Sequence, residues 1–229
     1  FIDLRTVEER LHGKNSIAHE FVDKRRGWCR SRFIPVDYDE DGRLLHVIYC
    51  IESIDEEKKR ENRLLYLAQT DLMTGLCNRG SGERRINELL QERTGGLLCL
   101  LDCDKFKAVN DTYGHSVGDK VIIAVAESLQ KSCRENDVLL RLGGDEFAIF
   151  MPGLLEQKSA EKFFDRLFEN VGEIAIEEMQ GKHVEISLGA CFYDGSEFVS
   201  FDQLYRNADH AMYQSKKKQG YSATIYDGQ

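Results

Sequence analysis

One unbroken apolar run, GLLCLLDCD at residues 96–104, constrains the fold more than any other feature of this chain. Runs of this kind are typical of strands that are buried on both faces of a sheet. Two acids, Asp102 and Asp104, close the run. A second run, RLGGDEFAIF at 141–150, also reads as buried strand but holds two adjacent acids beside its glycines. Because carboxylates are rarely fully buried unless something neutralises them, all of these acids must lie at the edge of the packed sheet.

The remaining patterns around this strand predict an α+β fold with a mixed central sheet flanked by helices. Residues 118–133 carry apolar side chains at the spacing of one helix face. Gly143-Gly144 joins two strand patterns and predicts a hairpin with a two-residue turn. The expected order is β-α-α-β-β-α-β-α, related to the split-βαβ plan. The strands are expected at 96–104, 137–142, 146–151 and 183–193, and the helices after 104, at 118–133, near 157–171 and at 200–217.

The first 70 residues show a different sequence pattern. Two β-rich runs, at 28–38 and 43–53, flank the turn cluster DEDG and predict a hairpin. The segment 55–70 is charged and free of glycine and proline, which predicts an exposed helix that could pair with a copy of itself. We therefore expect a β-rich domain at 1–55, a linker helix at 56–70 and the main domain at 71–229.

Composition excludes several classes of protein. A net charge of −9 argues against a broad nucleic-acid-binding surface, because phosphate backbones select basic faces. The seven cysteines are odd in number, scattered and without a CxxC pair, which favours buried free thiols in a reducing cytosol over disulfides or zinc. No apolar run approaches a membrane span and no signal peptide is visible, so we expect a cytoplasmic fragment without membrane contact. The chain begins without methionine, which leaves an upstream membrane anchor open.

The acids predict a metal site. In a split-βαβ arrangement the strand that ends in Asp102 lies beside the hairpin that carries Asp145 and Glu146, so the acidic ends converge. Converging carboxylates repel one another unless a cation lies between them, and all-oxygen ligation suits Mg²⁺ or Mn²⁺. Gly143 and Gly144 lack side chains and would let a ligand approach the backbone.

Residues near this edge could bind a nucleotide. The N–H groups of the turn after the acidic strand could cradle a triphosphate, with Lys107 and Lys216 adding charge. Asn110 and Asp119 could pair with the adjacent N–H donors of guanine. The structural alternatives are a solvated basic helix end for Lys216, a turn cap for Asn110 and a favourable helix N-terminus for Asp119. Spacing alone does not choose between these interpretations.

Several motifs in order resemble the GGDEF family of diguanylate cyclases, from about Asp71 to the C-terminus. They are DLMTGLCNR at 71–79, LDCDKFKAVNDTYGH at 101–115, GD at 118–119, RLGGDEF at 141–147 and NADHAMYQSKK at 207–217. The resemblance implies an enzyme that condenses two GTP molecules into cyclic di-GMP and releases two pyrophosphates. It also implies a fold similar to the palm of polymerases and nucleotide cyclases.

The resemblance assigns roles to the matching positions. Asp102 and Asp145 would ligate magnesium with the carbonyl of Cys103, and Glu146 would act as a ligand or help to deprotonate the 3′-hydroxyl. The residues implied for substrate binding are Asn110 and Asp119 for guanine, Phe106, Lys107 and Lys216 for the phosphates, and Gly143 and Gly144 beside them. Because each domain would hold one GTP, catalysis implies a homodimer.

Two further family features concern regulation and phosphate binding. Arg134 and Asp137 match an RxxD motif, five residues before GGDEF, which implies feedback binding of cyclic di-GMP. Relatives often carry glycine-arginine-asparagine after the last helix, whereas this chain reads KKKQGYSATIY. Lys217 or Lys218 would have to substitute for the missing arginine.

The N-terminal segment resembles, more weakly, the last strands and exit of a PAS sensor domain. The alternative is a small hairpin cap without a ligand. In the sensor interpretation, 56–70 would transmit the sensor state by changing how two catalytic domains pair. Two other functions remain open for the main domain: a catalytically silent receptor for GTP or cyclic di-GMP, and an enzyme that uses another nucleotide. Asp119 argues against adenine, whose N1 is an acceptor that would face a carboxylate acceptor.

Overall fold

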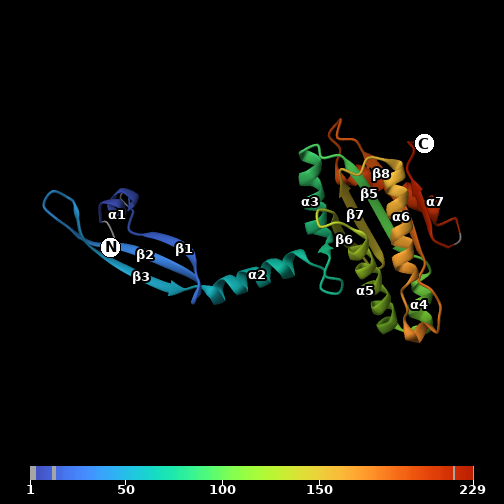
Figure 1. Cartoon of the computed structure of the whole chain (residues 1–229), viewed down its shortest axis with the longest axis horizontal. Coiled ribbons are helices and arrows are strands. Elements are labelled where there is room, and N and C mark those ends of the chain that lie inside the picture. Colours follow the sequence, from blue (N-terminus) through green and yellow to red (C-terminus); the bar gives the residue numbers. More distant parts are fainter. Residues whose placement is uncertain (1–3, 12–13, 219, 229) are drawn as a thin grey trace. The chain divides into compact units, whose positions relative to one another are not determined.

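The computed structural model describes residues 4–11, 14–218 and 220–228. The chain forms two compact units, Phe1–Tyr66 and Leu67–Gln229, each with its own sheet (Figure 1). Within the described residues, no helix combines the length and the apolar character that crossing a membrane requires.

The first unit is an antiparallel sheet with one short helix. The helix is α1 (Leu4–Leu11), and the strands, in spatial order, are β1 (Ile17–Asp23), β2 (Gly27–Tyr38) and β3 (Leu44–Ser53). The predicted hairpin is confirmed as β2 and β3, which pair over most of their length. A small core lies between α1 and the sheet, where Val7 and Leu11 pack with Leu44 of β3.

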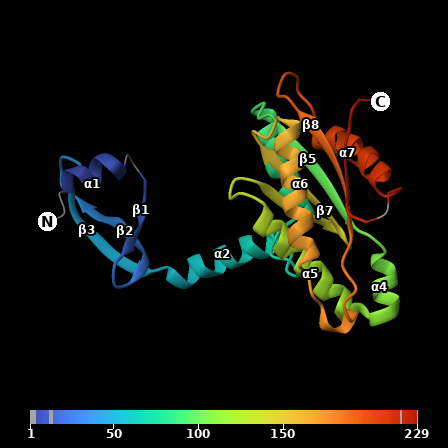
Figure 2. The ribbon, with the colours of Figure 1, turned by 45° about the vertical axis from the view of Figure 1, so that its right-hand side comes forward.

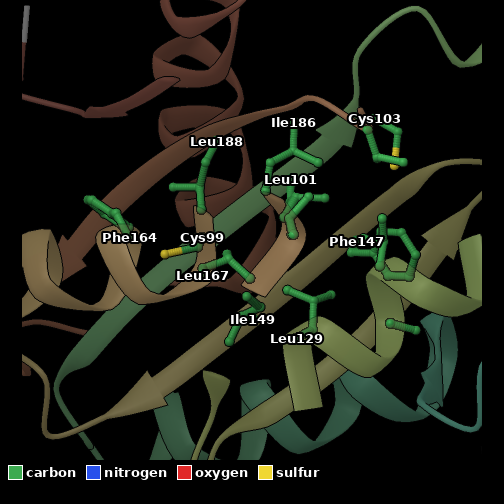
Figure 3. Packing of buried hydrophobic residues seen from close by; sticks show 14 of the residues in the cluster. Cys99, Leu101, Cys103, Leu129, Phe147, Ile149, Phe164, Leu167, Ile186 and Leu188 are labelled. Carbon is green, nitrogen blue, oxygen red and sulfur yellow. The ribbon is translucent and has the colours of Figure 1, made fainter. Parts of the chain in front are cut away.

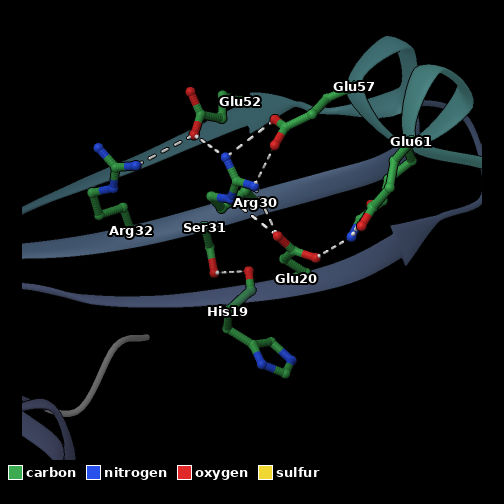
Figure 4. Close-up of polar contacts among 9 residues, drawn as sticks. His19, Glu20, Arg30, Ser31, Arg32, Glu52, Glu57 and Glu61 are labelled. Atoms are coloured by element: carbon green, nitrogen blue, oxygen red, sulfur yellow. Dashed lines mark hydrogen bonds and ion pairs between the residues drawn. The ribbon is translucent and has the colours of Figure 1, made fainter. Parts of the chain in front are cut away.

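The predicted exposed helix is confirmed as α2 (Asp55–Gln69), which has no buried residue. Its first turns are held to the sheet by charge. Arg30 of β2 contacts Glu20, Glu52 and Glu57, and Glu57 lies in the first turn of α2 (Figure 4). Lys58 also bonds Glu20, at 2.9 Å. These pairs connect the start of α2 to the sheet.

The second unit contains a mixed central sheet, as predicted, but with six strands rather than the four expected. The strand order is β4-β6-β7-β5-β8-β9, and the central strand β5 (Gly96–Cys103) is antiparallel to both of its neighbours. The edge strands pair in parallel. The other strands are β4 (Cys77–Asn78), β6 (Val138–Gly143), β7 (Glu146–Pro152), β8 (Ile186–Tyr193) and β9 (Ser222–Ile225).

Helices cover both faces of this sheet (Figure 2). On one face, Leu129, Phe164 and Leu167 pack against Leu101 and Ile149 (Figure 3). That face carries α5 (His115–Ser132) and α6 (Gln157–Gly172), with α4 (Phe106–Tyr113) and the 3₁₀ turn η1 (Glu177–Met179) at its border. The opposite face carries α3 (Arg79–Gln91) and α7 (Phe201–Ser215). The close approach of α7 needs Gly189 of β8, because a Cβ there would overlap the backbone of Ala208 and Met212.

Some elements differ from the sequence prediction. The order omitted α3, β4, η1 and β9. The hairpin turn consists of Gly144 and Asp145 rather than Gly143 and Gly144, because the pairing shifts between Arg141 and Gly143 and places Gly143 opposite Glu146. Gly144 has a φ of +55°, which a glycine adopts readily. All seven cysteines are free, but the prediction that they are buried holds for four of them: Cys77 and Cys133 are half-buried and Cys50 is exposed.

Candidate active site

Pairing within the sheet brings the acids together at one edge. Asp102, near the end of β5, is opposite Glu146 of β7 on one side and opposite Ser187 of β8 on the other. Asp145 lies in the turn directly before Glu146, and both acids are half-buried. The predicted convergence of the two acidic strand ends is therefore confirmed by the register.

Lys216 joins this edge from the end of α7. Its ammonium lies 2.8 Å from Oδ2 of Asp102. Partial burial lowers the pKa of Lys216, but the hydrogen bond and the charge of Asp102 outweigh burial, so the pKa is raised. The interpretation of Lys216 as a solvated helix end does not fit this contact. Lys216 thus provides a positive charge in direct contact with Asp102.

Asp104 and Asp145 both have a pKa above the ordinary value for aspartate. Burial is the main cause for both, and the negative charge of Asp102 adds to it. Ser187 opposes the shift at Asp104 by donating a hydrogen bond from Oγ to Oδ1 at 2.8 Å. The pKa of the buried Cys103 thiol is also raised, by burial and by the neighbouring acids, so the thiol stays neutral and only its main-chain carbonyl is a good ligand. An added cation would relieve the repulsion among these acids.

A pocket of about 520 Å³ opens beside the acids. Its lining has charges of both signs, with acids on the strand side and lysines at the end of α7. The lining residues are Asp102, Asp104, Lys105, Glu185, Lys216, Lys217, Lys218 and Gly220. Lys217 and Lys218, the residues expected to substitute for an arginine, line this pocket. Gln219, which follows them, is outside the described residues. Such a pocket suits a polyanion that arrives with a cation.

Arg141 fixes the tip of the acidic hairpin. Its Nε and Nη2 donate to the carbonyl oxygen of Gly144 at 3.0 and 2.7 Å. Its Nη1 lies 3.2 Å from both carboxylate oxygens of Asp71, which also accepts from the hydroxyl and the N–H of Thr74. Sequence reasoning gave no role to these residues, although the motifs that contain them were recognised.

The residues expected to read guanine meet where α4 and α5 join. Asn110 of α4 is half-buried, and its Oδ1 lies so close to Gly118 that a Cβ at Gly118 would overlap it. Asp119, the next residue, is exposed and lies just beyond the first turn of α5. Phe106 packs beside Gly118 and the core, while Lys107 is exposed on α4. Neither Asn110, Asp119 nor Lys107 lines the pocket beside the acids.

The RxxD residues lie in the loop between α5 and β6. Asp137 Oδ2 accepts from the N–H of Arg134 at 2.7 Å, and the N–H of Asp137 donates back to the Arg134 carbonyl at 3.0 Å. The carboxylate of Asp137 therefore closes the turn, while the side chain of Arg134 is exposed.

The acids at this edge do not form a ready-made metal cluster. Among the residues that the structure describes, no three histidine, cysteine or acidic side chains are grouped so that they could hold a metal ion. In this structure Asp102 is paired with Lys216, and Asp104 accepts a hydrogen bond from Ser187. The donor chemistry nevertheless fits Mg²⁺ or Mn²⁺, because Asp102, Asp145 and the Cys103 carbonyl offer only hard oxygen ligands.

Known relatives share both the sequence and the fold. Diguanylate cyclase DgcM of Escherichia coli K12 is 29% identical over 212 residues, which are 90% of this chain and 49% of that protein. The chain thus spans about half the length of that relative. Cyclic di-GMP phosphodiesterase PdeB of Shewanella oneidensis is 26% identical over 188 residues, which are 80% of this chain and 21% of that protein.

Solved structures and a family profile also match this chain. The coiled coil and GGDEF domain of DgcB from Caulobacter crescentus, in complex with c-di-GMP, is 25% identical and superposes with a TM-score of 0.66 over 75% of this chain and 93% of that one. The profile of the diguanylate cyclase GGDEF domain matches residues 68–222, which include the acidic edge, Lys216 and the α4–α5 junction. By sequence and by fold, then, this chain is a member of the GGDEF diguanylate cyclase family.

Proposed function

We propose that this chain is an active diguanylate cyclase, which condenses two GTP molecules into cyclic di-GMP and two pyrophosphates. The observation that carries the proposal is the register of β5 and β7, which brings Asp102, Asp145 and Glu146 to one sheet edge beside a lysine-lined pocket. Relatives that keep the fold without the chemistry would not need these acids together.

Asp102, Asp145 and the carbonyl of Cys103 would hold Mg²⁺ or Mn²⁺. When bound, the cation would neutralise phosphate charge and make the 3′-hydroxyl more acidic. Glu146 would accept the proton of that hydroxyl or complete the ligand set. Lys216 would hold phosphate oxygens, with Lys217 and Lys218 as substitutes for the missing arginine. Helix geometry also leaves the first N–H groups of α4, those of Phe106 and Lys107, for a phosphate, since intrahelical bonding begins at Ala108.

Asn110 and Asp119 would select guanine at the α4–α5 junction, and Gly143 and Gly144, both exposed, would leave room for the nucleotide. One domain offers one such site, so the second GTP would come from a second copy of the chain, and each 3′-hydroxyl would attack the partner's α-phosphate. The exposed helix α2 is the segment that would bring two copies together.

The direct test is incubation of the full chain with GTP and Mg²⁺, followed by mass detection of products. Cyclic di-GMP is the expected product, and it should be absent with ATP. GTP binding without product in a dimeric sample would support the silent receptor instead. A cyclic product from another nucleotide would instead indicate an enzyme that uses that nucleotide.

The guanine assignment predicts the effect of Gly118→Ala. The added methyl would push the Asn110 amide from its position, because it overlaps Oδ1. One lost or misaligned hydrogen bond is worth about 1 kcal/mol, so the KM for GTP should rise roughly fivefold to tenfold. Steady-state rates with GTP measure this, and Gly80→Ala is the control, since its Cβ would meet only Asn78 Oδ1 at 3.9 Å. An unchanged KM in Gly118→Ala would argue against Asn110 as a guanine ligand.

The RxxD motif would make the enzyme sensitive to its product. Arg134 presents an exposed guanidinium suited to phosphate and to guanine edges, and Asp137 would accept from guanine with the oxygen that does not close the turn. Arg134→Ala should raise the concentration of cyclic di-GMP that halves the rate by about tenfold or more. Rates with added product, referred to each variant's own initial rate, check this. Identical inhibition curves would remove Arg134 from the site.

Residues 1–55 would form the C-terminal part of a PAS-like sensor, and α2 would carry its state to the catalytic domain. A helix followed by a three-stranded antiparallel sheet supports this assignment. The charge pairs of Arg30 and Lys58 would make the sheet and the start of α2 move together. The cytoplasmic location expected from the sequence stays a prediction.

A further inference from the structure

The contact between Lys216 and Asp102 has a consequence for metal binding. The carboxylate of Asp102 is well buried, with 13% of its side chain exposed, and Oδ2 accepts from the Lys216 ammonium at 2.8 Å. The Lys216 side chain is 39% exposed, and Lys216 and Asp102 both line the pocket. A cation approaching Asp102 from the pocket therefore meets a positive charge on the oxygen it would use.

The backbone that carries Lys216 is held firmly. Ser215, which is fully buried, donates from Oγ to the Leu188 carbonyl at 2.8 Å, and its own carbonyl accepts from Ser222 Oγ at 2.8 Å. The N–H of Lys216 donates to the Met212 carbonyl at 2.9 Å. Because these bonds hold the main chain at Ser215 and Lys216, rotation of the Lys216 side chain breaks the contact without moving the backbone.

The two neighbouring lysines are directed elsewhere. Lys217 lies over the Tyr213 ring, 4.3 Å from its centroid, and also contacts Gln214. Lys218 donates to Thr224 Oγ1 at 3.4 Å. Of these three pocket lysines, then, Lys216 alone is paired with the acids, and Lys217 offers a matched lysine in the same pocket.

We propose that Lys216 is a built-in counter-ion of Asp102, which a divalent cation must displace and which nucleotide phosphates draw away. This inference rests on the proposed function. It adds that the binding of the metal and the binding of the nucleotide are coupled through Lys216. An ammonium and a metal ion cannot both stay on the same carboxylate oxygen, because their charges repel. The protein alone therefore binds the metal weakly, and a nucleotide that engages Lys216 strengthens metal binding. By linkage, the metal strengthens nucleotide binding by the same factor.

The test measures Mn²⁺ binding to the full chain by electron paramagnetic resonance of the free ion, without nucleotide. Lys216→Met keeps a long side chain without charge and should bind Mn²⁺ about tenfold more tightly, the effect of removing one charge-assisted contact. Lys216→Arg keeps the positive charge and should bind as weakly as wild type. Lys217→Met should also match wild type. Equal or weaker Mn²⁺ binding in Lys216→Met, with an unchanged circular dichroism spectrum, overturns the proposal.

A second series repeats the titration with α,β-methylene GTP, in which the bond to be broken is blocked. In wild type the analogue should increase Mn²⁺ affinity by a larger factor than in Lys216→Met, since only wild type has the counter-ion to release. If the analogue increases Mn²⁺ affinity by the same factor in wild type and in Lys216→Met, the proposed displacement of Lys216 is overturned. If the chain makes cyclic di-GMP but Lys216→Met leaves Mn²⁺ affinity unchanged, the counter-ion fails and the proposed function stands. If Lys216→Met binds Mn²⁺ more tightly but the wild-type chain forms no cyclic di-GMP, the competition between Lys216 and the metal is supported and the proposed cyclase activity is not.

Discussion

Replacing Glu146 with glutamine is expected to lower the rate of cyclic di-GMP formation by at least about a hundredfold, while GTP binding largely survives. General bases contribute about 10²–10⁴ to a rate, and an amide of the same shape cannot accept the proton of the 3′-hydroxyl. Glu146 is the first residue of β7 and pairs opposite Asp102, so the substitution keeps the backbone and removes only the charge. Single-turnover product formation and equilibrium binding of α,β-methylene GTP measure the two quantities separately.

A glutamate outside the strand, at the start of α6, provides the control. Glu156 follows β7 beyond Pro152, is exposed and contacts Ser159. Glu156→Gln should leave both the rate and the binding constant at their wild-type values. Equal rates in wild type and Glu146→Gln would remove Glu146 from the chemistry. A parallel loss of binding would assign it to the substrate site instead.

Features encoded in one stretch of sequence were predictable. The apolar run before Asp102 identifies a central strand, because only burial on both faces tolerates it. The glycine turn before Glu146 identifies a hairpin beside that strand. These two facts alone bring the acids to one edge, as the pairing of Asp102 with Glu146 confirms.

Elements without a periodic apolar pattern were not predictable. The helix α3 contains two glycines and buries few apolar side chains, so its sequence has little helical signal. It depends on tertiary contacts: a Cβ at Gly82 would overlap Leu140 of β6. The strand β9 is short and only partly buried, and it exists because β8 offers a parallel edge.

Contacts between distant residues explain why the site could be predicted only in part from the sequence. Lys216 and Asp102 are far apart in the sequence, and nothing local distinguishes Lys216 from Lys217, yet only one of the two bonds the acid. Likewise, the position of Asn110 depends on the missing side chain of Gly118 on another helix. Spacing fixes which residue types are available, whereas packing of α7 and α5 decides which of them meet.

Arg141→Met is expected to slow product formation by about tenfold or more, because it releases the tip of the acidic hairpin that carries Asp145 and Glu146. The guanidinium makes two hydrogen bonds to the Gly144 carbonyl and contacts both oxygens of Asp71, and only 13% of the Arg141 side chain is exposed. Its loss leaves the residue before Asp145 without support and Asp71 without its cation. We expect the free energy of unfolding to fall by about 1–3 kcal/mol. Cyclase rates and urea unfolding measure the two effects.

Arg166→Met separates the two effects, because Arg166 makes the same kind of contact away from the acids. Its Nε and Nη2 donate to one carbonyl, that of Ser132, at 3.2 and 2.7 Å. The two variants should lose similar stability, but only Arg141→Met should lose a tenfold rate. Asp71→Asn completes a double-mutant cycle, whose coupling with Arg141→Met should be about 0.5–3 kcal/mol.

Asp71 also makes this pair sensitive to pH. Although burial raises its pKa, the hydrogen bonds of Thr74 and the charge of Arg141 outweigh burial, so the pKa of folded Asp71 is lowered. A carboxylate with a lowered pKa stabilises the fold above its unfolded pKa, and this contribution disappears as the pH falls through the folded value. The coupling between Asp71 and Arg141 should therefore be full at neutral pH and shrink in acid. If the coupling between Asp71 and Arg141 is absent at neutral pH, Arg141 acts on Gly144 alone. Arg141→Met should then slow product formation in the Asp71→Asn protein as much as in wild type.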